Sequence, residues 1–100
     1  MFLYCISDNQ GRCKFGYSKD PHGRLRSLQT GNSNILELVY SISVDVVGIQ
    51  LLESQLHREI GRHRRLKGEW FSIDSSVARE LMQWFEIHHF HNLVFHYYLH

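Results

Sequence analysis

The chain has 100 residues, of which 43% are hydrophobic and 13% aromatic, and its formal net charge is +1. This length suits one compact domain and is too short for two, and the apolar content excludes general disorder, which needs low hydrophobicity and high net charge. No apolar run approaches the ~20 residues of a membrane span, and the first ten residues, MFLYCISDNQ, lack the features of a signal peptide. We therefore expect one intracellular, cytoplasmic domain over residues 1–100, without membrane association.

The nearly neutral net charge hides an uneven distribution. Between residues 12 and 67 there are ten Lys and Arg against five Asp and Glu, whereas residues 68–100 carry one Arg against four acidic residues. A basic portion on a nearly neutral chain is a weak electrostatic signature of a protein that binds a polyanion.

A β-hairpin is predicted at the start of the chain. Residues 2–6 (FLYCI) and 12–17 (RCKFGY) are short, apolar and aromatic, as strands are. The residues between them include Asp8, Asn9 and Gly11, which favour a turn. Gly16 is unusual inside a strand and indicates a bulge or a place where another backbone or a ligand comes close.

The hairpin carries both cysteines of the chain. With Gly11 in the left-handed bulge position of the turn, Cys5 would pair with Phe15, and Cys13 would be the diagonal neighbour of Cys5, about 7–8 Å away. That separation is too large for an unstrained disulfide. We therefore predict two free thiols.

The middle of the chain predicts a helix, a strand and a second helix. Asp20 can cap a helix that begins at Pro21 and runs to about Gln29. Residues 35–43 read as a third strand. A second helix over roughly 46–60 is indicated by apolar residues at helical spacing, namely Ile49, Leu52, Leu56 and Ile60.

The last third of the chain begins with a basic connection over residues 61–68 and a short strand or turn over 69–73. Ser75 or Ser76 can cap a final helix that runs through about Ile87. The aromatic, histidine-rich tail has the periodicity of neither helix nor strand. We predict an α+β protein in which a three-stranded antiparallel sheet is flanked by helices, in the order ββαβα plus a C-terminal helix.

Several side chains in this arrangement suit the hydrolysis of a phosphodiester. A tyrosine phenolate can take a proton from water if cations lower its pKa from ~10, and a guanidinium can hold the phosphate through two hydrogen bonds. A carboxylate can anchor Mg²⁺ or Mn²⁺. The candidate catalytic residues are Tyr4, Lys14, Tyr17, Arg24, Glu53 and His57. Each of them, taken singly, is more often a core or solvated residue, so the set carries weight only in combination.

Five motifs give the chain a family resemblance. They are residues 2–4 (FLY), 14–18 (KFGYS), 20–32 (DPHGRLRSLQTGN), 52–57 (LESQLH) and 68–71 (GEWF). Together they resemble the short phage and bacterial branch of the GIY-YIG nuclease superfamily, over about residues 2–73. The combination is specific, although each motif is short.

The resemblance implies a sandwich of helices around a three-stranded antiparallel sheet and one divalent metal. It implies that Tyr4 is the general base, that Arg24 binds phosphate and that Glu53 is the metal ligand. His57 lies one turn after Glu53, and since Mg²⁺ prefers oxygen ligands, we expect His57 to orient Glu53 or to contact phosphate. The chain departs from the family pattern at Lys14, which stands where the second motif has its leading tyrosine. Phe2 likewise stands in place of the first motif's glycine.

Tyr17 could restore a hydroxyl near the general base. Neighbouring strand residues point to opposite faces, however, so Tyr17 would join Tyr4 only if Gly16 kinks the strand.

The function that follows is a metal-dependent DNA endonuclease that uses Mg²⁺ or Mn²⁺. The residues expected to bind DNA through its backbone are Arg26, Arg58, Arg62, Arg64, Arg65 and Lys67. The alternative is a non-catalytic nucleic-acid-binding module on the same fold. A zinc-binding interaction protein is a third reading, but no Cys-x-x-Cys or His-Glu-x-x-His motif supports it.

Overall fold

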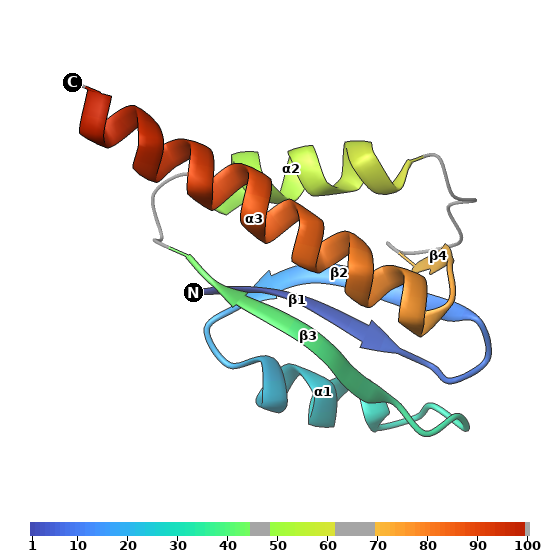
Figure 1. Cartoon of the computed structure of the whole chain (residues 1–100). Coiled ribbons are helices and arrows are strands. Elements are labelled where there is room, and N and C mark those ends of the chain that lie inside the picture. The colour runs from blue at the N-terminus through green and yellow to red at the C-terminus, as the bar shows by residue number, and fades with distance from the viewer. Residues whose placement is uncertain (45–48, 62–69, 100) are drawn as a thin grey trace.

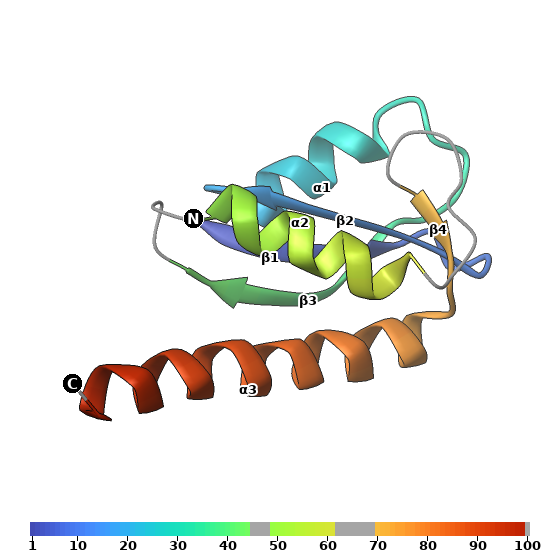
Figure 2. The same cartoon turned by 90° about the horizontal axis from the view of Figure 1, so that it is seen from above.

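The computed structural model describes residues 1–44, 49–61 and 70–99, which form an antiparallel sheet with helices on both faces. The strand order is β3-β1-β2-β4. Helix α1 covers one face of the sheet, and α2 and α3 cover the other (Figure 1 and Figure 2). The elements are β1 (Phe2–Ser7), β2 (Arg12–Ser18), α1 (Pro21–Gln29), β3 (Glu37–Ser43), α2 (Ile49–Ile60), β4 (Trp70–Ser72) and α3 (Ser75–Leu99). Among the described segments, no helix has the length and apolar character to cross a membrane.

The α+β class is confirmed, but the sheet has four strands rather than the predicted three, because residues 70–72 of the segment predicted as a short strand or turn form β4. Strand β4 pairs in antiparallel fashion with residues 12–14 of β2, so the order is ββαβαβα. A segment of three residues carries no periodicity of its own. Only its pairing with a strand more than fifty positions away distinguishes it from a turn.

The β1–β2 hairpin has the predicted register. Gly11 and Asn9 have positive φ angles of 81° and 59°, and Asp8 organises the turn because its buried carboxylate accepts hydrogen bonds from the backbone N–H groups of Gln10 (2.8 Å) and Arg12 (3.1 Å). Its other oxygen pairs with the Arg12 guanidinium. Cys5 consequently lies opposite Phe15, as the left-handed glycine predicts.

Both cysteines are free thiols, which confirms the prediction, and both are fully buried on the face covered by α2 and α3. The hydrogen bond between Cys5 and the Cys13 sulfur, together with burial, raises the pKa of Cys5 far above its usual range. The same hydrogen bond stabilises a thiolate at Cys13 and lowers its pKa. Any proton loss from this pair is therefore favoured at Cys13.

Helix α1 starts where the sequence predicts. Asp20 is the N-cap, and its carboxylate accepts a hydrogen bond from the backbone N–H of Gly23 at 3.0 Å. Pro21 follows at the first helical position, where its missing N–H leaves no bond unmade. The helix packs Leu25 and Leu28 against the sheet, which places its basic residues on the outside.

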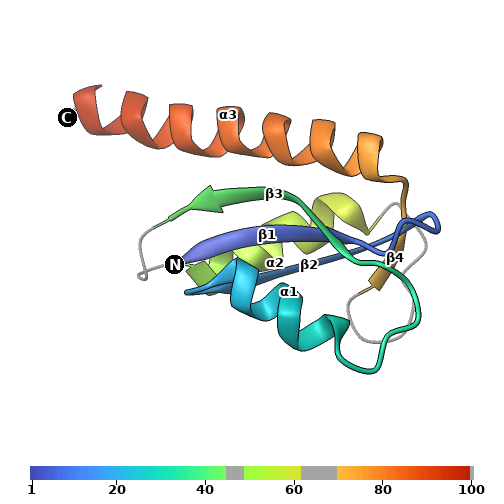
Figure 3. The same cartoon turned by 90° about the horizontal axis from the view of Figure 1, so that it is seen from below.

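Helix α3 is longer than predicted. It begins near the expected point, but the backbone N–H of Ala78 bonds to the Asp74 carbonyl at 2.9 Å, so Asp74 occupies the cap position predicted for Ser75 or Ser76. The helix continues to Leu99 and extends past the sheet (Figure 3). The chain has no Gly or Pro after Gly68, so nothing interrupts the helix at Ile87, where the prediction ended it.

Two apolar clusters lie on the two faces of the sheet. The larger lies under α2 and α3 and includes Leu56 and Ile60 of α2 and Met82 and Phe85 of α3. The smaller lies under α1 and contains Tyr4, Ile6 and Leu36, with Trp70 packed against them. Each candidate site residue is therefore described by the face of the sheet on which it lies.

Candidate functional site

Tyr4 is buried on the α1 face of the sheet, directly beside Gly16. The two residues are cross-strand partners, and Tyr4 is 2% exposed. A Cβ atom built on Gly16 would lie 2.6 Å from the Tyr4 hydroxyl oxygen and 2.9 Å from the carbon that carries it. Glycine is therefore required because the phenol passes over the backbone at this position. The group that comes close is a side chain of the neighbouring strand rather than the backbone or ligand expected from the sequence, and the β1–β2 register has no bulge at this point.

Lys14 lies on the same face as Tyr4. It pairs with Ile6 of β1 on one side and with Trp70 of β4 on the other, and directly paired residues share a face. Its ammonium nitrogen is 6.0 Å from the centroid of the Trp70 ring, within the range of a cation–π interaction. Lys14 is 7% exposed, so a cation and a phenol are both buried on one side of β2.

Tyr17 does not join this pair. The β1–β2 register continues without a shift through Tyr4–Gly16 and Leu3–Tyr17. Leu3 belongs to the cluster under α2 and α3, so Tyr17 lies on the opposite face from Tyr4. The structure therefore has no strand kink that would restore a second hydroxyl beside the general-base candidate.

Arg24 and Arg26 lie on α1 and are exposed to solvent. Since α1 covers the Tyr4 face, both arginines are on the Tyr4 side of the sheet. The Arg26 guanidinium is 3.8 Å from the Asp20 carboxylate, and the two side chains are 74% and 67% exposed. This ion pair is open to solvent and contributes little to stability.

Glu53 and His57 come from α2, which packs on the other face. Glu53 is half-buried and precedes the fully buried Leu56. The His57 Nε2 atom is 3.1 Å from the Phe15 carbonyl oxygen. The Phe15 carbonyl can only accept a hydrogen bond, so Nε2 is the donor. His57 is thereby tied to the backbone of β2, between Lys14 and Gly16.

The described structure thus brings Tyr4, Lys14 and Gly16 together, with Arg24 on the helix above them. It places the helix of Glu53 and His57 on the opposite face, with β2 between the two sets. Arg58 is exposed on α2. The remaining predicted DNA-binding residues, Arg62, Arg64, Arg65 and Lys67, lie outside the described residues.

The described side chains suit only a metal ion that needs few protein ligands. In the described segments, no group of three or more His, Cys, Asp and Glu side chains could hold a metal ion. Mg²⁺, however, is commonly bound by one or two carboxylates and retains several waters. The half-buried Glu53 carboxylate suits that single-anchor role, whereas the two buried thiols do not suit a zinc site.

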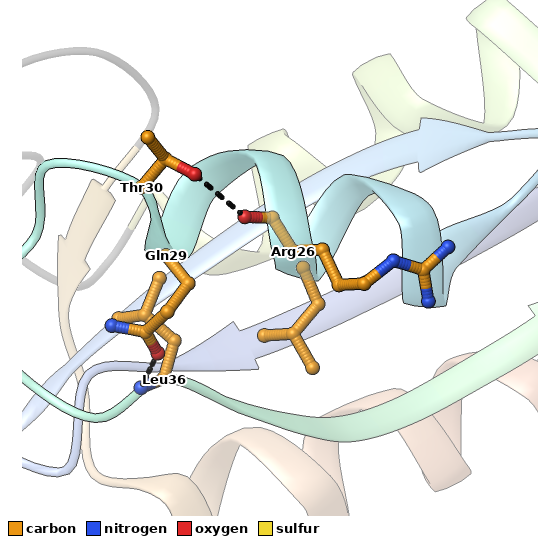
Figure 4. Close-up of a pocket in the computed structure, with 5 residues that line it drawn as sticks. Arg26, Gln29, Thr30 and Leu36 are labelled. Carbon is orange, nitrogen blue, oxygen red and sulfur yellow. Dashed lines mark hydrogen bonds between the residues drawn. The ribbon is translucent and has the colours of Figure 1, made fainter.

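Sequence reasoning missed a pocket of about 360 Å³ at the C-terminal end of α1, lined by Leu25, Arg26, Gln29, Thr30 and Leu36 (Figure 4). The Gln29 side chain anchors the loop that follows. Its oxygen accepts from the Leu36 N–H at 2.8 Å, and its nitrogen donates to the Asn34 carbonyl at 2.7 Å. The motif LQTGN in the sequence signals this anchoring, and the polar atoms of Gln29 are engaged within the protein.

Residues 1–86 match the family model of the T5orf172 domain. This domain occurs in phage and bacterial proteins and is associated with nuclease-like folds related to GIY-YIG. No curated protein and no solved structure matches the chain. Because the match includes all four strands and helices α1 and α2, together with most of the chain, the protein belongs to the T5orf172 domain family.

Proposed function

We propose that the protein is a divalent-metal-dependent DNA endonuclease. The observation that carries the proposal is the burial of the Tyr4 phenol and the Lys14 ammonium on one face of the sheet, with Gly16 leaving room for the phenol. A phenol and a cation on one face suit the removal of a proton from water. Membership of a family associated with nuclease-like folds supports the same reading.

Each candidate catalytic residue is assigned one role in the reaction. Tyr4 takes the proton from the attacking water. Lys14 and Arg24 hold the scissile phosphate and offset the negative charge that develops on it. Glu53 holds Mg²⁺ or Mn²⁺, and a cation bound there would stabilise the leaving oxygen. The exposed arginines of α1 and α2 and the basic stretch between α2 and β4 bind the DNA backbone without reading sequence.

A non-catalytic DNA-binding module is the second candidate. The observation that favours it is the placement of α2, which carries Glu53, on the face of the sheet opposite the Tyr4 ring. A carboxylate that does not reach the phosphate held by Lys14 and Arg24 would leave DNA binding intact and cleavage absent. The two candidates therefore differ in one measurable property.

The test is cleavage of supercoiled plasmid in the presence of Mg²⁺ or Mn²⁺, with DNA binding followed in parallel by fluorescence anisotropy. Glu53→Gln keeps the shape of the side chain and removes its charge, and Glu59→Gln on the same helix is the matched control. Endonuclease function predicts that only Glu53→Gln abolishes cleavage while DNA affinity is kept or increased. Cleavage by Glu53→Gln at the parental rate overturns the mechanism, and DNA binding without cleavage by the parental protein establishes the binding module.

A further inference from the structure

His57 connects two elements of the candidate site. It lies four residues after Glu53 on α2, and residues at this spacing share one side of a helix, about 6 Å apart along its axis. Its ring nitrogen Nε2 bonds to the Phe15 carbonyl. Phe15 is the residue between Lys14 and Gly16 on β2, so the hydrogen bond links the helix of Glu53 to the strand that carries the phosphate-binding candidate.

The bond reaches β2 just beyond the residues that pair with β4. Strand β4 pairs with residues 12–14 of β2, and the carbonyl that His57 reaches belongs to the next residue, Phe15. The donor for this carbonyl comes from a helix rather than from a strand.

Ring packing fixes the orientation of His57. Its ring contacts Phe71 edge-on, with centroids 5.6 Å apart, and Phe71 in turn contacts Phe15 in a T-shaped arrangement at 5.7 Å. The neighbouring Leu56 is fully buried in the core. The imidazole is therefore held between a buried helix position and a buried strand position, which restricts its rotation and maintains the bond to the carbonyl.

The donor role of Nε2 limits the acid–base chemistry that His57 can perform. Because the carbonyl only accepts, Nε2 keeps a proton in both the neutral and the charged ring. Neither state gives Nε2 a lone pair with which to take a proton from water. The geometry thus removes Nε2 from acid–base work and gives it the part of a fixed hydrogen-bond donor between α2 and β2.

We propose that His57 is a positioning residue that holds α2 in register on β2 and thereby sets where the Glu53 carboxylate lies. The part of this proposal that concerns Glu53 rests on the endonuclease function proposed above. The part that concerns α2 rests only on the His57–Phe15 hydrogen bond and the ring contacts.

Two substitutions separate the donor from the ring. His57→Gln keeps an N–H donor at similar reach, and His57→Leu keeps a similar volume and removes the donor. In the parental protein, ¹H–¹⁵N correlation spectra of labelled histidine should show the proton of neutral His57 on Nε2. A proton on Nδ1 alone would overturn the proposal at once.

The variants are then compared by amide hydrogen exchange, Mn²⁺ calorimetry and the pH dependence of plasmid cleavage. We expect His57→Leu to speed amide exchange in α2 about tenfold while β1 is unchanged, and to weaken Mn²⁺ binding 10–100-fold, roughly the effect of removing a residue that orients a metal ligand. His57→Gln should restore both and keep the parental pH–rate profile.

The outcomes distinguish this proposal from the function on which it partly rests. Unchanged α2 exchange in His57→Leu overturns the positioning role, and loss of one limb of the pH–rate profile in His57→Gln shows proton transfer instead. If the parental protein neither binds Mn²⁺ nor cleaves DNA while His57→Leu still loosens α2, the endonuclease proposal fails and the positioning of α2 by His57 stands.

Discussion

The Tyr4 phenol passes over Gly16 so closely that a methyl group on Gly16 would lie 2.6 Å from the hydroxyl oxygen. Real carbon–oxygen contacts are longer, so either the ring or the strand has to move when a side chain is added. The contact joins a residue assigned a chemical role to one whose contribution is the absence of a side chain. It also makes the position of the phenol testable without any substrate.

Gly16→Ala should therefore lower the free energy of unfolding by about 1–3 kcal/mol, the usual cost of overpacking. It should also reduce the rate of plasmid cleavage. Because the hydroxyl is the nearest atom, the cost should shrink when Tyr4→Phe is present, which a double-mutant cycle in urea would measure. Ser41→Ala is the control, since Ser41 is the exposed partner of Tyr4 on β3. An equal cost of Gly16→Ala with and without the hydroxyl would show that the hydroxyl oxygen is not its cause.

The basic connection between α2 and β4 should act on DNA affinity rather than on folding. Replacing Arg64 and Arg65 with Ala should weaken duplex binding to a similar degree for all sequences. It should also reduce the slope of log K against log salt by about 0.9 for each lost phosphate contact. Arg79→Ala on the exposed surface of α3 is the control and should change neither quantity. A parental salt slope in the double variant would contradict the assignment.

Tyr40 of β3 holds α3 through its hydroxyl, which donates to the Glu86 carboxylate at 2.7 Å. This hydrogen bond raises the pKa of Tyr40, and burial adds to the effect. A raised folded-state pKa stabilises the protein below the unfolded value of ~10, and this contribution is lost as pH rises through the folded value. Tyr40→Phe should cost about 1 kcal/mol of unfolding free energy at pH 7, and the difference from the parental protein should shrink above pH 10. A difference that is constant with pH would exclude the hydrogen bond as its source.

The two thiols should be protected by the fold. Cys5 and Cys13 are fully buried in the core, so a disulfide reagent at pH 8 should react with neither thiol in the native protein. Two thiols per chain should react in denaturant without reductant. The rate of native-state labelling then reports opening of the core between β1 and α3. Fast labelling at a rate that does not depend on stability would show that this face is open.

The sequence predicts the parts of the fold that rest on local chemistry. Gly11 and the turn residues beside it determine the hairpin register, and Asp20 with Pro21 determines the start of α1, because caps and turns need particular side chains at particular positions. The segment of β4 could be read only as a short strand or turn, since three residues show no alternation. The length of α3 was underestimated because the aromatic tail lacks an amphipathic pattern even though no residue stops the helix.

The sequence predicts the individual residues of the candidate site but not how they are arranged in space. The family motifs point to Tyr4, Lys14, Arg24 and Glu53. Which faces Arg24 and Glu53 occupy depends on how α1 and α2 pack, and that is decided by long-range burial of Leu25 and Leu56 rather than by the motifs. The bond from His57 to the Phe15 carbonyl was likewise hidden, because a backbone acceptor has no signature in sequence.

The tight turn at Asn9 and Gly11 has a consequence at the other end of the strands it joins. A slip of one residue between β1 and β2 would exchange the two faces of β2. Lys14 would then enter the apolar layer under α2 and α3, and Phe15 would take the place of the glycine beneath Tyr4. The left-handed conformations at residues 9 and 11 and the carboxylate of Asp8 act against that slip. Substitutions at the turn should therefore displace the Tyr4 phenol and the Lys14 ammonium, although both groups lie well away from the substituted residue.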